Sequence, residues 1–264
     1  FPSVLWQGHY REEYSCYADG PQVGQGHLYL CPSFPNYLLG VLILANRAGH
    51  VGPDIVFFML DQLAAKWLDA SRAGAANVPN FERLAGMGTN FTRCITSNPL
   101  CCPARATLAT GLSTRGHGVL QNGYYLDPSI RTFMQDLQGA GYWTGALGKV
   151  HFQPHYSSLH PDYRPYGFNV QHITEDGRGG EWLNWIRSEH PSCIESVYQT
   201  IWAREIPEFS QYGPAKEDLA AEMATVPSHG WVYELPFPEE LSQTNWVTAH
   251  ATNFIDNAEM NKPL

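Results

Sequence analysis

The sequence predicts an α/β fold in which helices cover both faces of a mostly parallel sheet. The segment "DIVFFML" (residues 54–60) is a short, β-rich, apolar run of the kind buried in such a sheet, and "DQLAAKWLDA" directly after it has helical spacing. Strand-like and helix-like segments then alternate repeatedly along the chain. With 264 residues, of which 44% are hydrophobic, the chain can bury one large core.

The first predicted strand carries a carboxylate at its C-terminal end. Asp61 follows the apolar run directly, and α/β folds commonly build their sites at such strand ends. The next helix is expected over residues 78–88, because Asn80 stands near its start and glycines close it. A second strand is expected over residues 90–97.

The later elements continue this alternation. Residues 103–111 predict a short helix, because proline in the first turn and glycine at the end are typical of helix termini. Residues 129–140 are expected to form a helix, and residues 142–147 a strand that leads into "GKVHF". The last twenty residues begin with a helical pattern and end in the approach to a further element, so we expect the protein to continue beyond Leu264.

Composition excludes several classes of protein. A net charge of -9 argues against nucleic acid or an anionic membrane as the main partner, because binding phosphate groups needs basic patches. Six cysteines without a Cys-x-x-Cys pair predict neither a disulfide scaffold nor structural zinc. The longest apolar run, residues 37–45, is shorter than the roughly 20 residues of a transmembrane segment. We interpret residues 1–50 as an unassigned leader, either unrelated to the domain or a sequence artefact.

Two adjacent cysteines stand at the start of the helix expected over residues 103–111. If Pro103 begins this helix, Cys101 and Cys102 lie just before its N-terminus. Unpaired N–H groups and the helix dipole there stabilise negative charge, lower a thiol pKa and favour an oxyanion. Arg105 follows in the first turn and can pair with a carboxylate or with an anionic substrate. The alternative is that both cysteines are small apolar residues of a helix-start turn.

Two motifs resemble a known family. The run "CCPARATLATG" resembles the first signature of the formylglycine-dependent sulfatases, Cys-x-Pro-Ser/Ala-Arg followed by Thr-Gly. The register that fits proline and arginine assigns Cys101 to the catalytic position and Cys102 to the variable one. The run "GYWTGALGKVHF" is similar to the second signature, Gly-Tyr-x-Thr-x-x-x-Gly-Lys-x-His, and it supplies Lys149 and His151 at the end of a strand, where both would point to one side. Taken alone, this second pair also fits a solvated lysine beside a surface histidine.

The resemblance implies a fold and a domain. The fold is the three-layer αβα sandwich with a mostly parallel mixed sheet that sulfatases share with alkaline phosphatase. Residues 51–264 would form the N-terminal part of the sulfatase catalytic domain, truncated at the C-terminus. The family places further metal ligands and the leaving-group acid in the part that follows, so we expect this chain alone to be an incomplete, inactive fragment.

A metal site is implied at the end of the first strand. Sulfatases usually carry two consecutive acids there that bind calcium, whereas this chain has Asp61 and then Gln62, whose carbonyl oxygen is still a suitable ligand. The resemblance implies a divalent metal held by Asp61, Gln62 and modified Cys101. Calcium fits best, and manganese or magnesium stay open because one carboxylate fewer weakens selectivity. The alternative is that Asp61 caps the following helix.

The resemblance also implies catalytic roles. A separate formylglycine-generating enzyme would oxidise Cys101 to formylglycine, whose hydrate attacks sulfur and then expels sulfate. Arg105 would orient this hydrate. Lys149, which would also bind the substrate, and His151 would oppose the charge that builds on the ester.

Two more residues are candidates for contact with the substrate. Asn122, in "LQNGYYLD", either contacts the substrate or belongs to a turn, since Asn-Gly is a turn signal. His155 is expected at the rim of the site. The segment "HITEDGRGGEW" predicts a glycine-rich surface loop, and the tryptophan-rich segment after it predicts helix packing.

Three functions remain open from the sequence. The leading one is hydrolysis of a sulfate ester or sulfamate on a small molecule or carbohydrate. The second is hydrolysis of a phosphonate or phosphate monoester or diester at the same site, which the Asp61-Gln62 pair favours and Gly-Lys-x-His disfavours. The third is an inactive fragment or pseudo-enzyme that serves as a binding or structural module. The sequence does not distinguish a cytoplasmic from a periplasmic or secreted protein.

Overall fold

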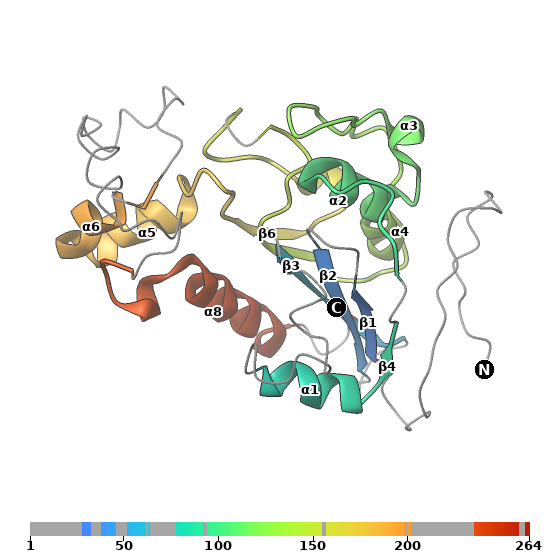
Figure 1. Cartoon of the computed structure of the whole chain (residues 1–264), viewed down its shortest axis with the longest axis horizontal. Coiled ribbons are helices and arrows are strands. Elements are labelled where there is room, and N and C mark those ends of the chain that lie inside the picture. Colours follow the sequence, from blue (N-terminus) through green and yellow to red (C-terminus); the bar gives the residue numbers. More distant parts are fainter. Residues whose placement is uncertain are drawn as a thin grey trace.

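The computed structural model describes two short strands near the N-terminus and most of the chain from residue 52 onward (Figure 1). The described residues are 28–32, 38–45, 52–61, 63, 78–91, 94–154, 157–198, 200–201, 235–258 and 262–264. The first two of these segments are described by their backbone alone.

The larger sheet has four strands in the order β3-β2-β1-β4. Its strands are β1 (Leu28–Pro32), β2 (Leu38–Ala45), β3 (Asp54–Asp61) and β4 (Thr89–Asn90). Strand β2 pairs antiparallel with both β1 and β3, whereas β1 and β4 are parallel. The predicted strand that delivers Asp61 is therefore confirmed as β3. Strands β1 and β2 fall within the leader that sequence analysis left unassigned.

A second sheet consists of the parallel strands β5 (Gly145–Gly148) and β6 (Val170–Ile173). The C-terminal residues connect the two sheets. Ile55 of β3 donates its N–H to the carbonyl of Leu264 at 2.7 Å, and Trp143, just before β5, donates to the carbonyl of Pro263 at 2.8 Å. Segment 262–264 thus lies between β3 and the start of β5.

The α/β class is confirmed; the four-stranded sheet is mixed and the two-stranded sheet is parallel. The parallel pairs are β1·β4 and β5·β6, and the antiparallel pairs both involve β2. The connection from Ala45 to Asp54 is too short for a parallel crossover, which needs a dozen or more residues. An antiparallel hairpin is the pairing that this connection permits.

Helices lie above and below the strands in the view of Figure 1. Helices α2, α3 and α4 lie above, and α1 and α8 lie below. The helices are α1 (Pro79–Gly86), α2 (Cys101–Thr110), α3 (Thr114–His117), α4 (Phe133–Gly139), α5 (Glu181–Glu189), α6 (Ile194–Tyr198) and α8 (Gln243–Asp256), with short 3-10 helices η3 (Arg164–Tyr166), η4 (Pro191–Cys193) and η6 (Glu239–Leu241). Within the described residues, no helix is long and apolar enough to span a membrane.

The helices expected over residues 78–88, 103–111 and 129–140 form with shifted starts, whereas the helical pattern of residues 64–70 lies outside the described residues. Helix α2 begins at Cys101, two positions before the expected start, because proline is tolerated anywhere in a first turn whose N–H groups have no helical partner. Both cysteines are therefore inside the first turn rather than before it. Helix α4 begins later than expected, where the Thr132 hydroxyl accepts from the N–H of Gln135 and the Gln135 side chain accepts from the N–H of Thr132.

The strand expected over residues 90–97 is wrong for most of its length. Strand β4 is confined to Thr89–Asn90, and residues 94–97 are not strand. Thr96 donates its hydroxyl to the carbonyl of Asn98, whose side chain in turn accepts the N–H of Leu100. Such local side-chain bonds offer the backbone an alternative to a sheet ladder.

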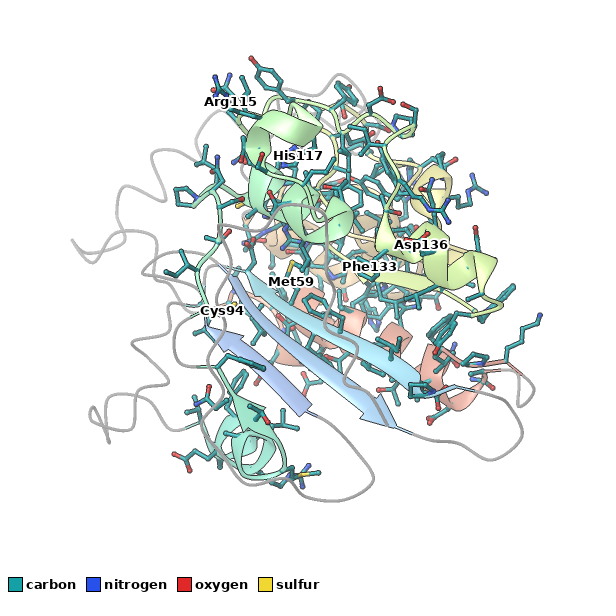
Figure 2. All side chains as sticks on the ribbon, turned by 90° about the vertical axis from the view of Figure 1, so that its right-hand side faces the viewer. Met59, Cys94, Arg115, His117, Phe133 and Asp136 are labelled. Atoms are coloured by element: carbon teal, nitrogen blue, oxygen red, sulfur yellow. The ribbon has the colours of Figure 1, made fainter. Side chains whose placement is uncertain are left out.

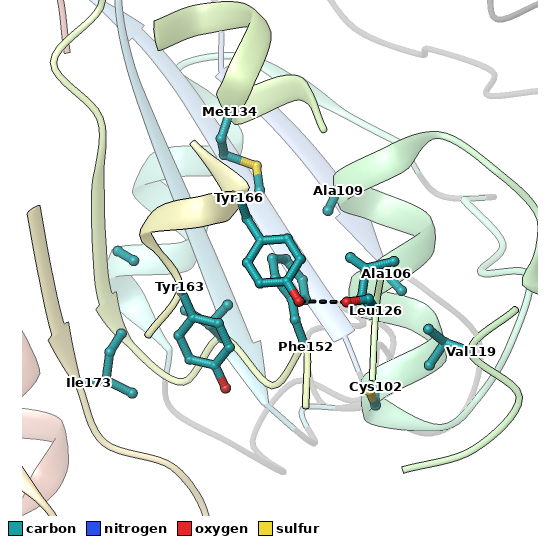
Figure 3. Close-up of a cluster of buried hydrophobic side chains, with 12 residues drawn as sticks. Cys102, Ala106, Ala109, Val119, Leu126, Met134, Phe152, Tyr163, Tyr166 and Ile173 are labelled. Atoms are coloured by element: carbon teal, nitrogen blue, oxygen red, sulfur yellow. Dashed lines mark hydrogen bonds between the residues drawn. The ribbon is translucent and has the colours of Figure 1, made fainter. Parts of the chain in front are cut away.

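Two buried apolar clusters hold the described region together. The first joins α2, α4 and β5 to the segment after Lys149 (Figure 3), and its residues are Cys102, Ala106, Ala109, Val119, Leu126, Met134, Ala146, Val150, Phe152, Tyr163, Tyr166 and Ile173. The second is built around Trp182, Leu183 and Ile186 of α5, which confirms helix packing for the tryptophan-rich segment. Figure 2 shows His117 on α3 and Asp136 on α4, both on the α2 side of the strands.

Candidate active site

The ends of several elements meet at one place. Asp61 ends β3, Cys101 begins α2, Lys149 follows β5, and Asp176 follows β6. Because β5 and β6 are parallel, their C-terminal ends lie at the same edge, which is where α/β folds commonly place a site. The contacts described next connect all four residues.

Asp61 is the centre of these contacts. Its Oδ2 lies 2.6 Å from Nζ of Lys149, and its Oδ1 lies 3.7 Å from Nη2 of Arg105. The thiol of Cys101 donates to the same Oδ1 with an Sγ to oxygen distance of 3.9 Å. One carboxylate therefore faces two cations and the sulfur.

Lys149 is shared by two carboxylates. Its Nζ lies 2.8 Å from Oδ2 of Asp176, in addition to the contact with Asp61, and its side chain is 11% exposed. Burial alone would lower the pKa of Lys149, but the charges of Asp176 and Asp61 outweigh it and raise the pKa above its ordinary value. The ammonium therefore stays charged at neutral pH.

Arg105 connects helix α2 to the segment after β5. Its side chain is 4% exposed, and its Nη1 donates to the carbonyl of Lys149 at 2.6 Å. The same guanidinium faces Asp61, so it fixes the backbone of Lys149 relative to β3. A buried guanidinium is pre-organised for such a role, because its donors lie in a rigid plane.

The thiol of Cys101 is half-buried and is not activated. Burial is the main reason that its pKa lies above the usual value of 9.0, although Lys149 works in the opposite direction. The carboxylates of Asp61 and Asp176 add to the increase. The expectation that the helix start lowers the pKa of this thiol is therefore wrong, because burial and two carboxylates outweigh the neighbouring cations.

Cys102 is a core residue. It is completely buried, its Sγ donates to the carbonyl of Tyr124 at 3.4 Å, and burial raises its pKa to about 12. Its N–H donates to Oδ1 of Asn122 at 3.0 Å. Asn122 thus satisfies an N–H of the first turn of α2, which places this side chain beside Cys101.

His151 is buried in the turn that follows β5. It is completely buried and has a φ of 54°, a left-handed conformation that is uncommon outside glycine. The expectation that Lys149 and His151 share one face of a strand does not apply, because β5 ends at Gly148, before either residue. Both residues belong to the turn after the strand.

Comparison with known proteins identifies the family. The model of the sulfatase family matches residues 53–255, which is most of the chain. The chain belongs to the sulfatase family. The resemblance carried by the two motifs is thereby confirmed, and both motifs fall inside the matched range.

Several sulfatases are similar to this chain in sequence. An arylsulfatase of Clostridium perfringens is 26% identical over 224 residues, covering 80% of this chain and 41% of the relative. A choline-sulfatase of Rhizobium meliloti is 37% identical over 100 residues, 38% of this chain and 20% of the relative. An N-acetylglucosamine-6-O-sulfatase of Bacteroides thetaiotaomicron is 30% identical over 132 residues, 48% of this chain and 24% of the relative. The chain spans less than half the length of these relatives.

One solved structure is a partial match. The phosphonate monoester hydrolase of Agrobacterium radiobacter overlaps 64% of this chain and 31% of its own, with 19% identity and a TM-score of 0.39. An overlap of this extent carries no argument about function.

The structure brings together most of the sulfatase residues that the sequence predicts. Asp61 contacts Cys101, Arg105 and Lys149, and Arg105 also contacts the backbone of Lys149. Asn122 adjoins them through Cys102. Gln62 and His155 lie outside the described residues.

Two acids at this site were missed in the sequence. Glu175 and Asp176 belong to the segment that was predicted to be a glycine-rich surface loop, yet Glu175 is buried and Asp176 binds Lys149. A signal was present, because two consecutive acids closely follow Val170 and Ile173, apolar residues of a short strand, as Asp61 follows its own strand.

The donors for a metal are incomplete in the described part of the chain. No group of three His, Cys, Asp or Glu side chains there is placed to hold a metal ion. Asp61 is the carboxylate that fits such a role, because it is 33% exposed and adjoins Cys101. Calcium requires six to eight oxygen ligands, so one carboxylate alone does not form the site.

Proposed function

We propose that the protein is a sulfuric ester hydrolase that uses a formylglycine formed from Cys101 to cleave a sulfate ester or sulfamate. The observation that carries this proposal is the convergence of Cys101, Asp61 and Lys149 at the start of helix α2. Membership of the sulfatase family supports it further.

The charges of the site suit an anionic substrate in an acidic protein. The chain carries a net charge of -9, so a sulfate group depends on local cations for binding. Lys149 and Arg105 supply two such cations beside Cys101. Donors that are already in place where negative charge develops stabilise the transition state without reorganisation. Lys149 would bind a sulfate oxygen, and Arg105 would orient the nucleophile.

The state of the thiol supports a role through modification. A thiol with a raised pKa is a poor nucleophile at neutral pH, because the thiolate is the reactive form. A formylglycine-generating enzyme would replace this thiol by an aldehyde. The hydrate of that aldehyde carries hydroxyl groups, so its reactivity does not depend on forming a thiolate. We place His151 beneath this group as a hydrogen-bonding residue, and Asn122 and His155 at the substrate side.

A divalent cation completes the proposal. Asp61, Gln62 and the oxygen that replaces the sulfur of Cys101 are the proposed ligands, with calcium preferred over manganese or magnesium because oxygen donors suit it. Such a cation supplies positive charge that offsets the charge of the reacting ester. Asp176, which also binds Lys149, would keep that lysine at the site if Asp61 held a cation.

The relatives indicate a class of substrate. Their names mention aryl, choline and N-acetylglucosamine sulfates, so we propose a small-molecule or carbohydrate sulfate ester. A phosphonate or phosphate ester hydrolase of the same superfamily is the alternative. Comparing kcat/KM of the full-length protein for an aryl sulfate and for the matching aryl phosphonate separates the two, because the proposal requires the sulfate to be the better substrate.

Mass spectrometry tests the modification directly. The chain is expressed together with a formylglycine-generating enzyme, reduced because Cys94 is disulfide-bonded, and digested with trypsin. The proposal expects the peptide of residues 94–105 to lose the mass that corresponds to conversion of a thiol to an aldehyde. Cys102→Ala should keep this conversion, and Cys101→Ala should lose it. An unmodified peptide would support the third function, a binding or structural module without catalysis.

A further inference from the structure

Two consecutive backbone N–H groups converge on one carboxylate oxygen. Val150 and His151 donate to Oε1 of Glu175 at 3.2 and 2.9 Å. Successive N–H groups next to a left-handed residue form a concave site for an anion, and His151 has the required positive φ of 54°. Here the anion is a side chain of the same protein, so the turn after Lys149 is fastened to the segment after β6.

Glu175 is itself held in a fixed position. The hydroxyl of Tyr163, a residue of the first apolar cluster (Figure 3), donates to the same Oε1 at 2.7 Å. The preceding residue, Thr174, donates its N–H to the carbonyl of Gly148 at 3.2 Å and so extends the pairing of β5 with β6. The carboxylate therefore connects the turn to the core and to the sheet at once.

We propose that Glu175 is a positioning residue that fixes the turn carrying Lys149 and His151. This inference rests on the proposed function, because it assigns those two residues to catalysis. Glu175 acts through the backbone and does not touch the substrate. A residue other than glycine keeps a left-handed conformation only where its surroundings hold it. Without the carboxylate, His151 relaxes toward an ordinary conformation, and Lys149 is displaced with it.

The charge of Glu175 matters as well as its shape. Hydrogen bonds to an ionised acceptor are roughly twice as strong as bonds between neutral groups. Glu175→Gln keeps the size of the side chain and one acceptor oxygen but removes the charge. It therefore weakens the two N–H bonds without creating a cavity.

Amide hydrogen exchange measured by NMR on the full chain is the first test. Glu175→Gln should speed exchange at Val150 and His151 and leave Ile173 unchanged. Glu181→Gln is the matched control, because Glu181 of α5 accepts at 3.3 Å the N–H of Ile173, which ends β6 two residues before Glu175. It should change exchange at Ile173 alone. Unchanged exchange at Val150 and His151 in Glu175→Gln would overturn the proposal.

Kinetics on the complete, formylglycine-containing enzyme is the second test. Because a displacement of about 1 Å costs on the order of a hundredfold in rate, Glu175→Leu should lower kcat by at least about tenfold and leave KM within about twofold. Glu175→Gln should recover part of this loss. An unchanged kcat, or a loss that appears only in KM, contradicts a positioning role. If Glu175→Leu does not fold, Glu175→Gln carries both measurements.

The two tests separate this inference from the proposed function. Exchange at Val150 and His151 does not require catalysis. A protein that hydrolyses no sulfate ester, yet shows the expected exchange pattern, refutes the enzymatic role of the turn while the contact with Glu175 stands.

Discussion

The ammonium of Lys149 lies 2.6 Å from the carboxylate of Asp61, although 88 positions separate the two residues in the sequence. Strand β3 delivers the carboxylate, and the turn after β5 delivers the ammonium. Asp176 shares the same ammonium at 2.8 Å, so two carboxylates from different strands meet through one lysine. Loss of Lys149 would therefore remove the cation that the two carboxylates share.

Lys149→Ala should reduce hydrolysis of an aryl sulfate by about 10²- to 10³-fold in kcat, the usual effect of removing one donor that stabilises transition-state charge. Lys149→Arg should recover little, because a planar guanidinium does not reproduce a compact ammonium between two carboxylates. Lys262→Ala is a suitable control. Lys262 lies over the ring of Trp143, and this contact involves neither Asp61 nor Asp176. Equal losses in the Lys149 and Lys262 variants would refute the assignment.

The two adjacent cysteines should respond differently to substitution. Cys101→Ser should abolish the sulfatase activity of the complete enzyme in cells whose maturation enzyme acts on cysteine. It should have little effect on the free energy of unfolding, because this side chain is half-buried. Cys102→Ala should leave activity within a few-fold and lower the free energy of unfolding by about 1 kcal/mol, because it removes a completely buried sulfur from the core. Urea denaturation and activity on the same samples measure both effects. Loss of activity in Cys102→Ala at unchanged stability would show that the assigned register is wrong.

The sequence predicted most of the site because its motifs constrain local geometry. The register of proline and arginine in the first motif assigned Cys101 and Arg105, and the second motif assigned Lys149, through their resemblance to the sulfatase signatures. The local pattern alone also fitted apolar cysteines of a helix start and a solvated lysine. Asp61 followed from a strand of eight residues with a carboxylate at its end.

The parts that were missed depend on contacts between distant segments. Nothing in the local pattern around Glu175 shows that its carboxylate binds the N–H groups of Val150 and His151, because that pairing arises when β6 lies beside β5. The pairing of β2 was missed for a related reason. A short apolar run fits a buried strand and a buried helix segment equally well until its partner is known.

Removing the charge of Asp176 should make the unmodified Cys101 more reactive. The carboxylate of Asp176 raises the pKa of this thiol, so Asp176→Asn should lower that pKa and increase the fraction of thiolate at pH 8. Lys149 keeps its contact with Asp61 in this variant and continues to favour the thiolate. Alkylation by iodoacetamide, followed by mass spectrometry, should therefore be faster at Cys101. The free Cys193 provides an internal reference whose rate should not change. Slower alkylation of Cys101 would mean that Asp176 acts mainly by holding Lys149.

The stability of the fold should fall at mildly acidic pH because of His117. This side chain is buried, its Nδ1 accepts the N–H of Val119 at 3.1 Å, and its Nε2 lies 3.0 Å from the hydroxyl of Thr107. Burial holds the pKa of His117 below its usual value of 6.5, so the unfolded chain binds a proton more readily than the folded one. The contribution of the neutral ring is thus present above pH 6.5 and is lost as the pH falls toward the lower pKa of the folded state.

Substitution of His117 isolates this contribution. His117→Asn keeps an acceptor for the N–H of Val119 but does not titrate, so the difference in unfolding free energy between pH 8 and pH 5 should become smaller than in the unchanged protein. His160→Asn is the matched control, because His160 is exposed and should leave that difference as it was. Burial also lowers the pKa of His250, which contributes in the same direction and remains in both variants, so His117→Asn should remove part of the pH dependence rather than all of it. Urea denaturation of the two variants at both pH values measures the effect, and an identical pH dependence in His117→Asn and His160→Asn would exclude His117 as its source.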